Sequence, residues 1–232
     1  MLCRTAFTNP ALTLRDQPKA VESVFLGILS TKNLTTYQLV DYFIAMEMKE
    51  RILTSAQRLV QQRGFNGFSY ADIAKEVGIR KASLHHHFPS KTDLGVALIQ
   101  SYTVQLSNAL AGINSSQLAP QDKLAAYIDI YRNALSADCM CLGGMLATEA
   151  LTLDSSMLPS LKRFFELNVS WLANVLTEGS LHEFKLTNSP EQHARAILSA
   201  LQGALLIARA SGDHAGFEQT GEILRQGLLR EG

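Results

Sequence analysis

The sequence predicts an all-α protein, because apolar residues recur at helical spacing and no segment alternates apolar and polar residues as a strand does. Of the 232 residues, 47% are apolar and 18% are charged, which excludes a disordered chain and predicts a well-buried core. From residue 49 onwards, glycine, proline and serine divide the chain into segments of helix length.

Residues 1–45 differ from the rest of the chain and form a leader of uncertain status. Pro10 and Pro18 interrupt it, and Met46 and Met48 stand directly before a strongly amphipathic segment. Two interpretations stay open: translation starts at one of these methionines in the native protein, or the leader contributes an extra helix that packs on the next domain.

No targeting or membrane segment is expected. The first 20 residues lack an apolar core behind a basic flank, so they do not resemble a secretory signal. No window approaches the run of about 18 apolar residues that a spanning helix needs. We therefore expect a cytoplasmic protein without membrane contact.

The segment 46–95 contains a long helix followed by two short ones. The long helix ends at Gly64, and Ser69 with Asp72 three residues later forms the start of the next helix. That helix ends at Gly78, and a second short helix follows over about 80–87. Two short helices joined by a tight turn and braced by a longer helix make a helix-turn-helix arrangement, whose second helix can enter a major groove.

The residues of this segment carry a family resemblance. RILTSAQRLVQQRGFNGFSYADIAKEVGIRKASLHHHFPSKTDL resembles the DNA-binding domain of the TetR family of bacterial repressors, through its G-F pair, D-I-A helix, V-G-I turn and H-H-F-P-S-K-T-D-L tail. Ile73, Ala74, Val77, Ile79, Leu84 and Phe88 would form the small core between the helices.

The resemblance implies where this domain contacts DNA. Side chains in the first turn of the second short helix reach base edges or phosphates, and helix N-termini hold phosphates. The family usually has Tyr at the position of His85, so this sequence departs from the pattern there. The residues expected to contact DNA are Ser69, Tyr70, Arg80, Lys81, Ser83, His85, His86, His87 and Lys91.

The three consecutive histidines do not predict a metal site. Adjacent residues of a helix point about 100° apart, whereas zinc pairs on a helix stand at i and i+4. Cys139 and Cys141 are two residues apart and would point away from each other on a helix. We expect neither a metal nor a cofactor.

Residues 96–232 predict a helical domain, and the family resemblance implies that this domain binds a ligand and forms the dimer. After a long helix that starts near Pro89 and Ser90, further helices are expected over about 121–137, 142–153, 156–179, 190–211 and 214–229. The family resemblance implies a homodimer through the last two helices. The face expected to pair consists of Ala196, Ile197, Ala200, Leu201, Ala204, Leu205 and Ala208, covered by Leu224, Leu228 and Leu229, and its alternative interpretation is a core face.

The same resemblance implies a ligand cavity among the middle helices. The candidate lining residues are Tyr127, Tyr131, Met145, Phe164, Phe165 and Trp171, each of which could instead be core. Cys141 opens a helix, as in a branch of the family in which some members respond to quinones, aldehydes or other electrophiles. A helix N-terminus favours the thiolate that such a sensor needs, but a free cysteine is also commonly a small buried apolar residue.

Charge is divided unevenly along the chain. The whole sequence balances 21 basic against 21 acidic residues, but residues 46–95 carry net +3 and residues 96–232 carry net −4. The basic segment is the one that resembles a DNA-binding domain. The family resemblance therefore implies a repressor, not an enzyme, that binds a palindromic operator as a dimer and is released by a small molecule or an electrophile. The alternative is an all-helical small-molecule-binding protein or enzyme without DNA-binding activity, but no nucleophile elbow or phosphate-binding loop supports it.

Overall fold

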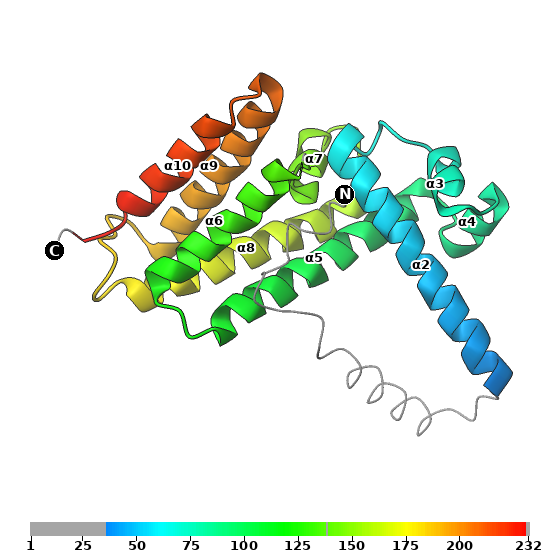
Figure 1. Cartoon of the computed structure of the whole chain (residues 1–232), viewed down its shortest axis with the longest axis horizontal. Helices are drawn as coiled ribbons and strands as arrows, with labels where there is room; N and C mark the ends of the chain where they lie inside the picture. The colour runs from blue at the N-terminus through cyan, green and yellow to red at the C-terminus, as the bar shows by residue number, and fades with distance from the viewer. Residues whose placement is uncertain (1–35, 138, 231–232) are drawn as a thin grey trace.

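The structure, a computed structural model, describes residues 36–137 and 139–230 (Figure 1). Its regular elements are helices, and within the described ranges the only β pairing is an isolated bridge between Phe184 and Leu229. The all-α prediction is therefore confirmed. The leader up to residue 35, with both of its interpretations, lies outside the described residues.

The helices form a small head and a larger body. The head consists of α2 (Thr36–Arg63), α3 (Tyr70–Val77) and α4 (Lys81–His87). The body consists of α5 (Lys91–Ser115), α6 (Pro120–Ser136), α7 (Leu142–Thr148), the short 3₁₀ helix η2 (Ser155–Met157), α8 (Leu158–Gly179), α9 (Pro190–Ser211) and α10 (His214–Gln226). Figure 1 shows α3 and α4 at one end of the molecule and the α9–α10 pair at the other.

Local sequence explains where most helices begin. The carboxylate of Asp72 accepts the backbone N–H of Ser69 at 2.7 Å, and that of Asp93 accepts the N–H of Ser90 at 3.0 Å. These are capping boxes, which satisfy amides that have no partner inside the helix. A third capping box, between Ser189 and Gln192, opens α9.

Three helices differ in length from the prediction, and the smallest difference is in α10, which ends at Gln226 and not at residue 229. α2 begins at Thr36 and not near residue 49, because residues 36–48 contain neither glycine nor proline that would interrupt the helix. The predicted domain boundary at residue 45 therefore falls inside α2. α7 ends at Thr148 and not at residue 153. Glu149 turns away there to bind the head, and Asp154 starts η2 by accepting the N–H of Ser156.

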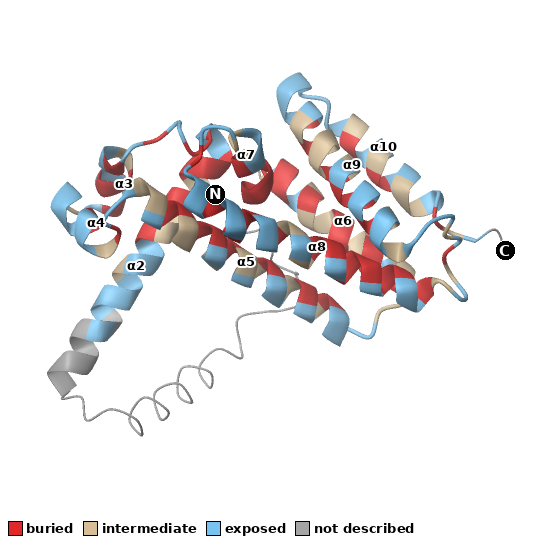
Figure 2. Cartoon of the chain, turned by 180° about the vertical axis from the view of Figure 1, so that it is seen from behind, coloured by how far each residue is buried: buried red, intermediate tan, exposed pale blue. Residues whose placement is uncertain are grey.

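One continuous cluster of buried apolar side chains passes from the head into the body. In Figure 2 the buried residues lie on the sides of the helices that face one another. Among the largest fully buried side chains are Tyr127, Phe164, Phe184 and Phe217. No helix in the described part of the chain is long and apolar enough to cross a bilayer.

The expected pairing face of α9 requires a correction. Ile197, Leu201, Leu205 and Ala208 are at most 2% exposed, because α9 packs against α8 and α10 of the same chain. For these four residues the core interpretation is the correct one. The outward stripe of α9 consists of Ala196, Ala200, Gly203, Ile207 and Ala210, all exposed or partly exposed.

Gly64 and Gly78 provide a matched test of the junction between head and body. Both have φ near +80°, which costs an L residue roughly 1–2 kcal/mol. A Cβ on Gly64 would lie 2.1 Å from Oε1 of Glu149, whereas a Cβ on Gly78 would meet nothing within 4 Å. We expect Gly64→Ala to lower the free energy of unfolding in urea clearly more than Gly78→Ala does. Equal losses would contradict the close approach of Glu149.

Candidate nucleic-acid interface

The head holds α3 and α4 in a tight turn. Gly78 adopts the left-handed conformation, and the N–H groups of Gly78 and Ile79 both donate to the carbonyl of Ala74 at 3.0 Å. From α2, the guanidinium of Arg51 donates to the carbonyl of Val77 at 2.8 Å. These contacts fix the end of α3 on α2 and so fix the direction in which α4 leaves the turn.

A small core sets the angle between the two short helices. Of the six residues predicted to form it, Ile73, Leu84 and Phe88 are at most 3% exposed, Ala74 and Val77 are 7% exposed, and Ile79 is partly buried. Leu84 is the one buried residue of α4. The other residues of this helix are exposed, except His87, which is partly buried.

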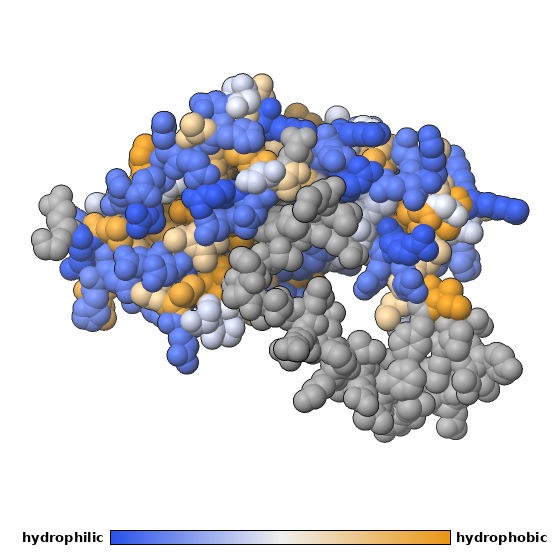
Figure 3. Space-filling view, viewed as in Figure 1, coloured by the Kyte–Doolittle hydropathy of each residue, from blue (hydrophilic) through white to orange (hydrophobic). Residues whose placement is uncertain are grey.

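The solvent face of α4 is basic and polar. Arg80 is the N-cap, and Arg80, Lys81, Ser83 and His86 are all exposed. His87 is half-buried, and burial lowers its pKa, assisted by the neighbouring charges of His86 and Lys49. Figure 3 shows hydrophilic residues around a smaller hydrophobic area at this end of the molecule. A short exposed basic helix of this kind has the dimensions and charge that suit a major groove.

Tyr70 does not belong to this surface, which corrects its predicted role as a DNA contact. It is 6% exposed, and its hydroxyl donates to the carbonyls of Phe88 and Ser90 at 2.9 and 2.5 Å. Burial, with a smaller effect of Asp93, raises its pKa to about 12. Tyr70 thus ties α3 to the turn after α4.

Lys91 also points inward. Its ammonium donates to the carbonyl of Phe68 at 2.5 Å and lies 4.9 and 4.3 Å from the ring centroids of Phe65 and Phe68. Burial lowers its pKa. The structure therefore gives Lys91 a cation–π contact with the α2–α3 turn, and its contact with a DNA phosphate stays a prediction.

Two other predicted contacts are partly engaged inside the head. The backbone amide and the hydroxyl of Ser69 both donate to Asp72, so the carboxylate occupies the place foreseen for a phosphate. His85 is exposed, but its ring lies 4.8 Å from that of Tyr70 and its Nδ1 is 3.1 Å from the carbonyl oxygen of Pro89. Apart from Ser69 and His85, the exposed residues among the predicted DNA contacts are Arg80, Lys81, Ser83 and His86.

A second candidate site lies inside the body. A small cavity, here called the chamber, has a volume of about 10 Å³, which is about what one water molecule needs. It is lined by Tyr102, Tyr131, Cys141, Phe164 and Asn168, together with apolar residues of α5 and α6. Three of the residues predicted for a ligand cavity, Tyr131, Phe164 and Cys141, are among them.

The other predicted cavity residues pack around the chamber. Tyr127 stacks on Trp171 with ring centroids 5.5 Å apart, and its hydroxyl donates to Oδ1 of Asn168 at 2.7 Å. Phe165 packs on Phe164 edge to face, 5.3 Å between centroids. Met145 lies partly buried on α7 and is not among the lining residues.

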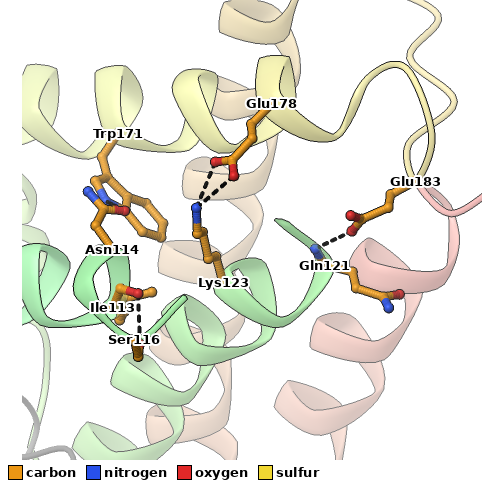
Figure 4. Close-up of polar contacts among 8 residues, drawn as sticks. All are labelled: Ile113, Asn114, Ser116, Gln121, Lys123, Trp171, Glu178 and Glu183. Carbon is orange, nitrogen blue, oxygen red and sulfur yellow. Dashed lines mark hydrogen bonds and ion pairs between the residues drawn. The ribbon is translucent and has the colours of Figure 1, made fainter. Parts of the chain in front are cut away.

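The far end of the body is braced by polar contacts (Figure 4). The indole N–H of Trp171 donates to Oδ1 of Asn114 at 3.1 Å. The mostly buried ammonium of Lys123 donates to both carboxylate oxygens of Glu178, and the carboxylate of Glu183 accepts the N–H of Gln121 at 2.8 Å. These contacts join α5, α6 and α8 on the side of the chamber away from the head.

Cys141 is buried at the N-cap of α7 and is a free cysteine. Its sulfur accepts a hydrogen bond from Nε2 of Gln202 at 3.3 Å and a longer one from the hydroxyl of Tyr102 at 4.0 Å. Oε1 of Gln202 is buried and has no hydrogen-bond partner in the structure. From the start of α7, the thiol therefore contacts side chains of both α5 and α9.

Burial keeps the phenols of the chamber protonated. It raises the pKa of Tyr102, Tyr127 and Tyr131 above the usual value of a tyrosine. No lining residue carries a charged side chain. The chamber is thus a neutral environment of hydroxyl, amide, thiol and aromatic groups.

Sequence reasoning missed Tyr102, Asn168 and Gln202. Asn168 and Gln202 stand among apolar residues on predicted helices, and a polar residue on an apolar face is a signal that could have been used. Their meeting with Cys141 could not be read from the sequence, since they belong to separate helices.

The fold and the basic surface of α4 define the class of protein, a helix-turn-helix protein with a helical C-terminal domain. The model of "Bacterial regulatory proteins, tetR family" matches residues 52–98. A TetR-family transcriptional regulator from Agrobacterium tumefaciens is 31% identical, covering 80% of this chain and 100% of its own, with a TM-score of 0.77. A TetR transcriptional regulator from Legionella pneumophila is 38% identical over 78% of this chain and 96% of its own, with a TM-score of 0.72.

The chain belongs to the TetR family. It is also 25% identical to the HTH-type transcriptional repressor NemR of Escherichia coli over 173 residues, which is 71% of this chain and 85% of that repressor. These relatives are transcriptional regulators, so the resemblance inferred from the sequence is confirmed.

A pair of matched double variants tests the role of α4. We expect Arg80→Ala/Lys81→Ala to weaken DNA binding and to flatten its dependence on salt, since each lost phosphate contact removes about 0.9 from the slope of log K against log[salt]. Lys162→Ala/Arg163→Ala removes an adjacent, exposed basic pair from α8 and should leave the slope unchanged. Fluorescence anisotropy over a series of salt concentrations measures both. Equal slopes for the two variants would refute the assignment.

Proposed function

We propose that the protein is a transcriptional repressor that binds a palindromic operator as a homodimer and is released when an effector acts on the body. The observation that carries this proposal is the exposed basic face of α4, held at a fixed angle by the core around Leu84. In this proposal Arg80, Lys81 and Ser83 contact base edges or phosphates, and His86 and His87 lie beside them.

A dimer is needed because one head reads only a half-site, and a two-fold dimer matches a palindrome. The outward stripe of α9 supports this pairing. It consists largely of small residues at helical spacing, and its Ile207 is 67% exposed. Ile223 on the neighbouring α10 is 69% exposed. Small residues let two helices approach closely, and the two isoleucines would lose their exposure to water in the pair.

The chamber is the proposed effector site. Its lining carries no charge, so it favours an uncharged effector, and its small volume favours a reagent that bonds to Cys141 over a bulky ligand in a preformed pocket. An uncharged alkene electrophile would add to the sulfur: an S–C bond forms, the alkene double bond becomes single, and the thiol proton ends on the neighbouring carbon. The added group would have to displace Gln202 or Tyr102, because both contact the sulfur.

The test uses the protein with Cys3 and Cys139 replaced by Ser, which removes the disulfide bond of Cys139 and leaves Cys141 as the single cysteine of the chain. We expect it to bind DNA from upstream of its own gene with two chains per duplex, and to lose about 5- to 150-fold in affinity after treatment with N-ethylmaleimide. A further Cys141→Ser replacement should keep full affinity under the same treatment.

Three results would count against the proposal. Absence of binding to this DNA would refute the operator, and one chain per duplex would refute the dimer. Release of the Cys141→Ser protein to the same extent as its parent would refute the thiol as effector site.

A further inference from the structure

Helix α7 is hydrogen-bonded to the head at both of its ends. At its start, Nε2 of Gln61 donates to the carbonyl of Met140 at 2.9 Å, and the N–H of Met140 donates to the carbonyl of Gln61 at 3.3 Å. At its finish, the two carboxylate oxygens of Glu149 accept the N–H groups of Phe65 and Asn66, both at 2.8 Å. We call these four contacts the α7 clamp.

The clamp is built into the fold at some cost. Gln61 is fully buried, and its Oε1 has no hydrogen-bond partner, so half of its side-chain amide is unsatisfied. At the other end a Cβ on Gly64 would meet Glu149 at 2.1 Å, so only glycine admits the carboxylate. A carboxylate that accepts two successive backbone N–H groups makes strong, directional bonds.

The same short helix starts at the chamber. Cys141 is the N-cap of α7 and follows Met140 directly, and α7 spans seven residues, or about 10 Å. A group attached to the sulfur of Cys141 would therefore act directly beside Met140, at one end of α7, and Glu149 lies at the other end.

We infer that Gln61 and Glu149 are positioning residues that transmit a change at Cys141 to the DNA-binding head through α7. This inference rests on the proposed function, in which a group added to Cys141 is the signal that releases DNA. The hydrogen bonds of the clamp do not themselves involve DNA. In this scheme the effector does not need to reach the head. It biases two arrangements of one packed helix, and the energy comes from its different affinity for the two.

The competing interpretation is that the clamp only stabilises the fold. A matched control separates the two, because the body contains a second carboxylate that accepts a backbone amide: Glu183 holds the N–H of Gln121 at 2.8 Å, at the far end from the head (Figure 4). Glu149→Ala and Glu183→Ala therefore remove the same kind of contact at two places. Gln61→Leu removes the side-chain hydrogen bond at the opposite end of the clamp and leaves Glu149 unchanged.

The first measurement is the ratio of DNA affinities before and after N-ethylmaleimide treatment, in the protein where only Cys141 can react. We expect a ratio of about 5- to 150-fold in that parent protein and in Glu183→Ala. Glu149→Ala and Gln61→Leu should lower the ratio to within about twofold of one. A ratio in both clamp variants equal to that of the parent would overturn the inference.

The second measurement needs no DNA. In the full chain, alkylation of Cys141 should raise the hydrogen-exchange rates of the Phe65 and Asn66 amides at least about tenfold, while the Gln121 amide held by Glu183 keeps its rate. Unchanged exchange at residues 65 and 66 in the alkylated protein would overturn the inference. Failure to bind DNA, with increased exchange at these two amides, would refute the proposed function and support the clamp.

Discussion

The turn between α2 and α3 determines how the head is held on the body. Gly64 enters it with φ of +80°, and the next two amides are held by Glu149 of the body. Lys91 also lies over the rings of Phe65 and Phe68. Because two residues of the body hold this turn, the direction of the head depends on the packing of the body.

Much of the fold could be predicted from the sequence, because its boundaries are local. Ser69 with Asp72, Gly78, and Ser90 each act through neighbours within a few residues, and the helices they delimit are found where expected. The end of α7 could not be predicted, since Glu149 stops the helix by contacts with residues more than 80 positions away in the sequence. The start of α2 at Thr36 could not be predicted, because the apolar residues before residue 49 do not form a clear helical stripe.

The candidate sites could be predicted only in part, for a related reason. Sequence identifies which residues lie on the exposed turn of a short helix, and Arg80, Lys81 and Ser83 are exposed as expected. It does not show which way a long side chain points. The hydrogen bonds that Tyr70 and Lys91 make to backbone carbonyls of the head could therefore not be predicted. The chamber combines residues of separate helices, and only the packing of those helices brings Gln202 to Cys141.

We infer that head and body form one cooperative unit, because the body holds the α2–α3 turn of the head. Equilibrium urea unfolding at one protein concentration tests this, followed by the fluorescence of Trp171, the single tryptophan, and by far-ultraviolet circular dichroism. Trp171 reports on the body alone, whereas the dichroism reports on all helices. The claim predicts coincident transitions. A loss of helical signal that precedes any change at Trp171 would show that the head unfolds by itself, and would contradict it.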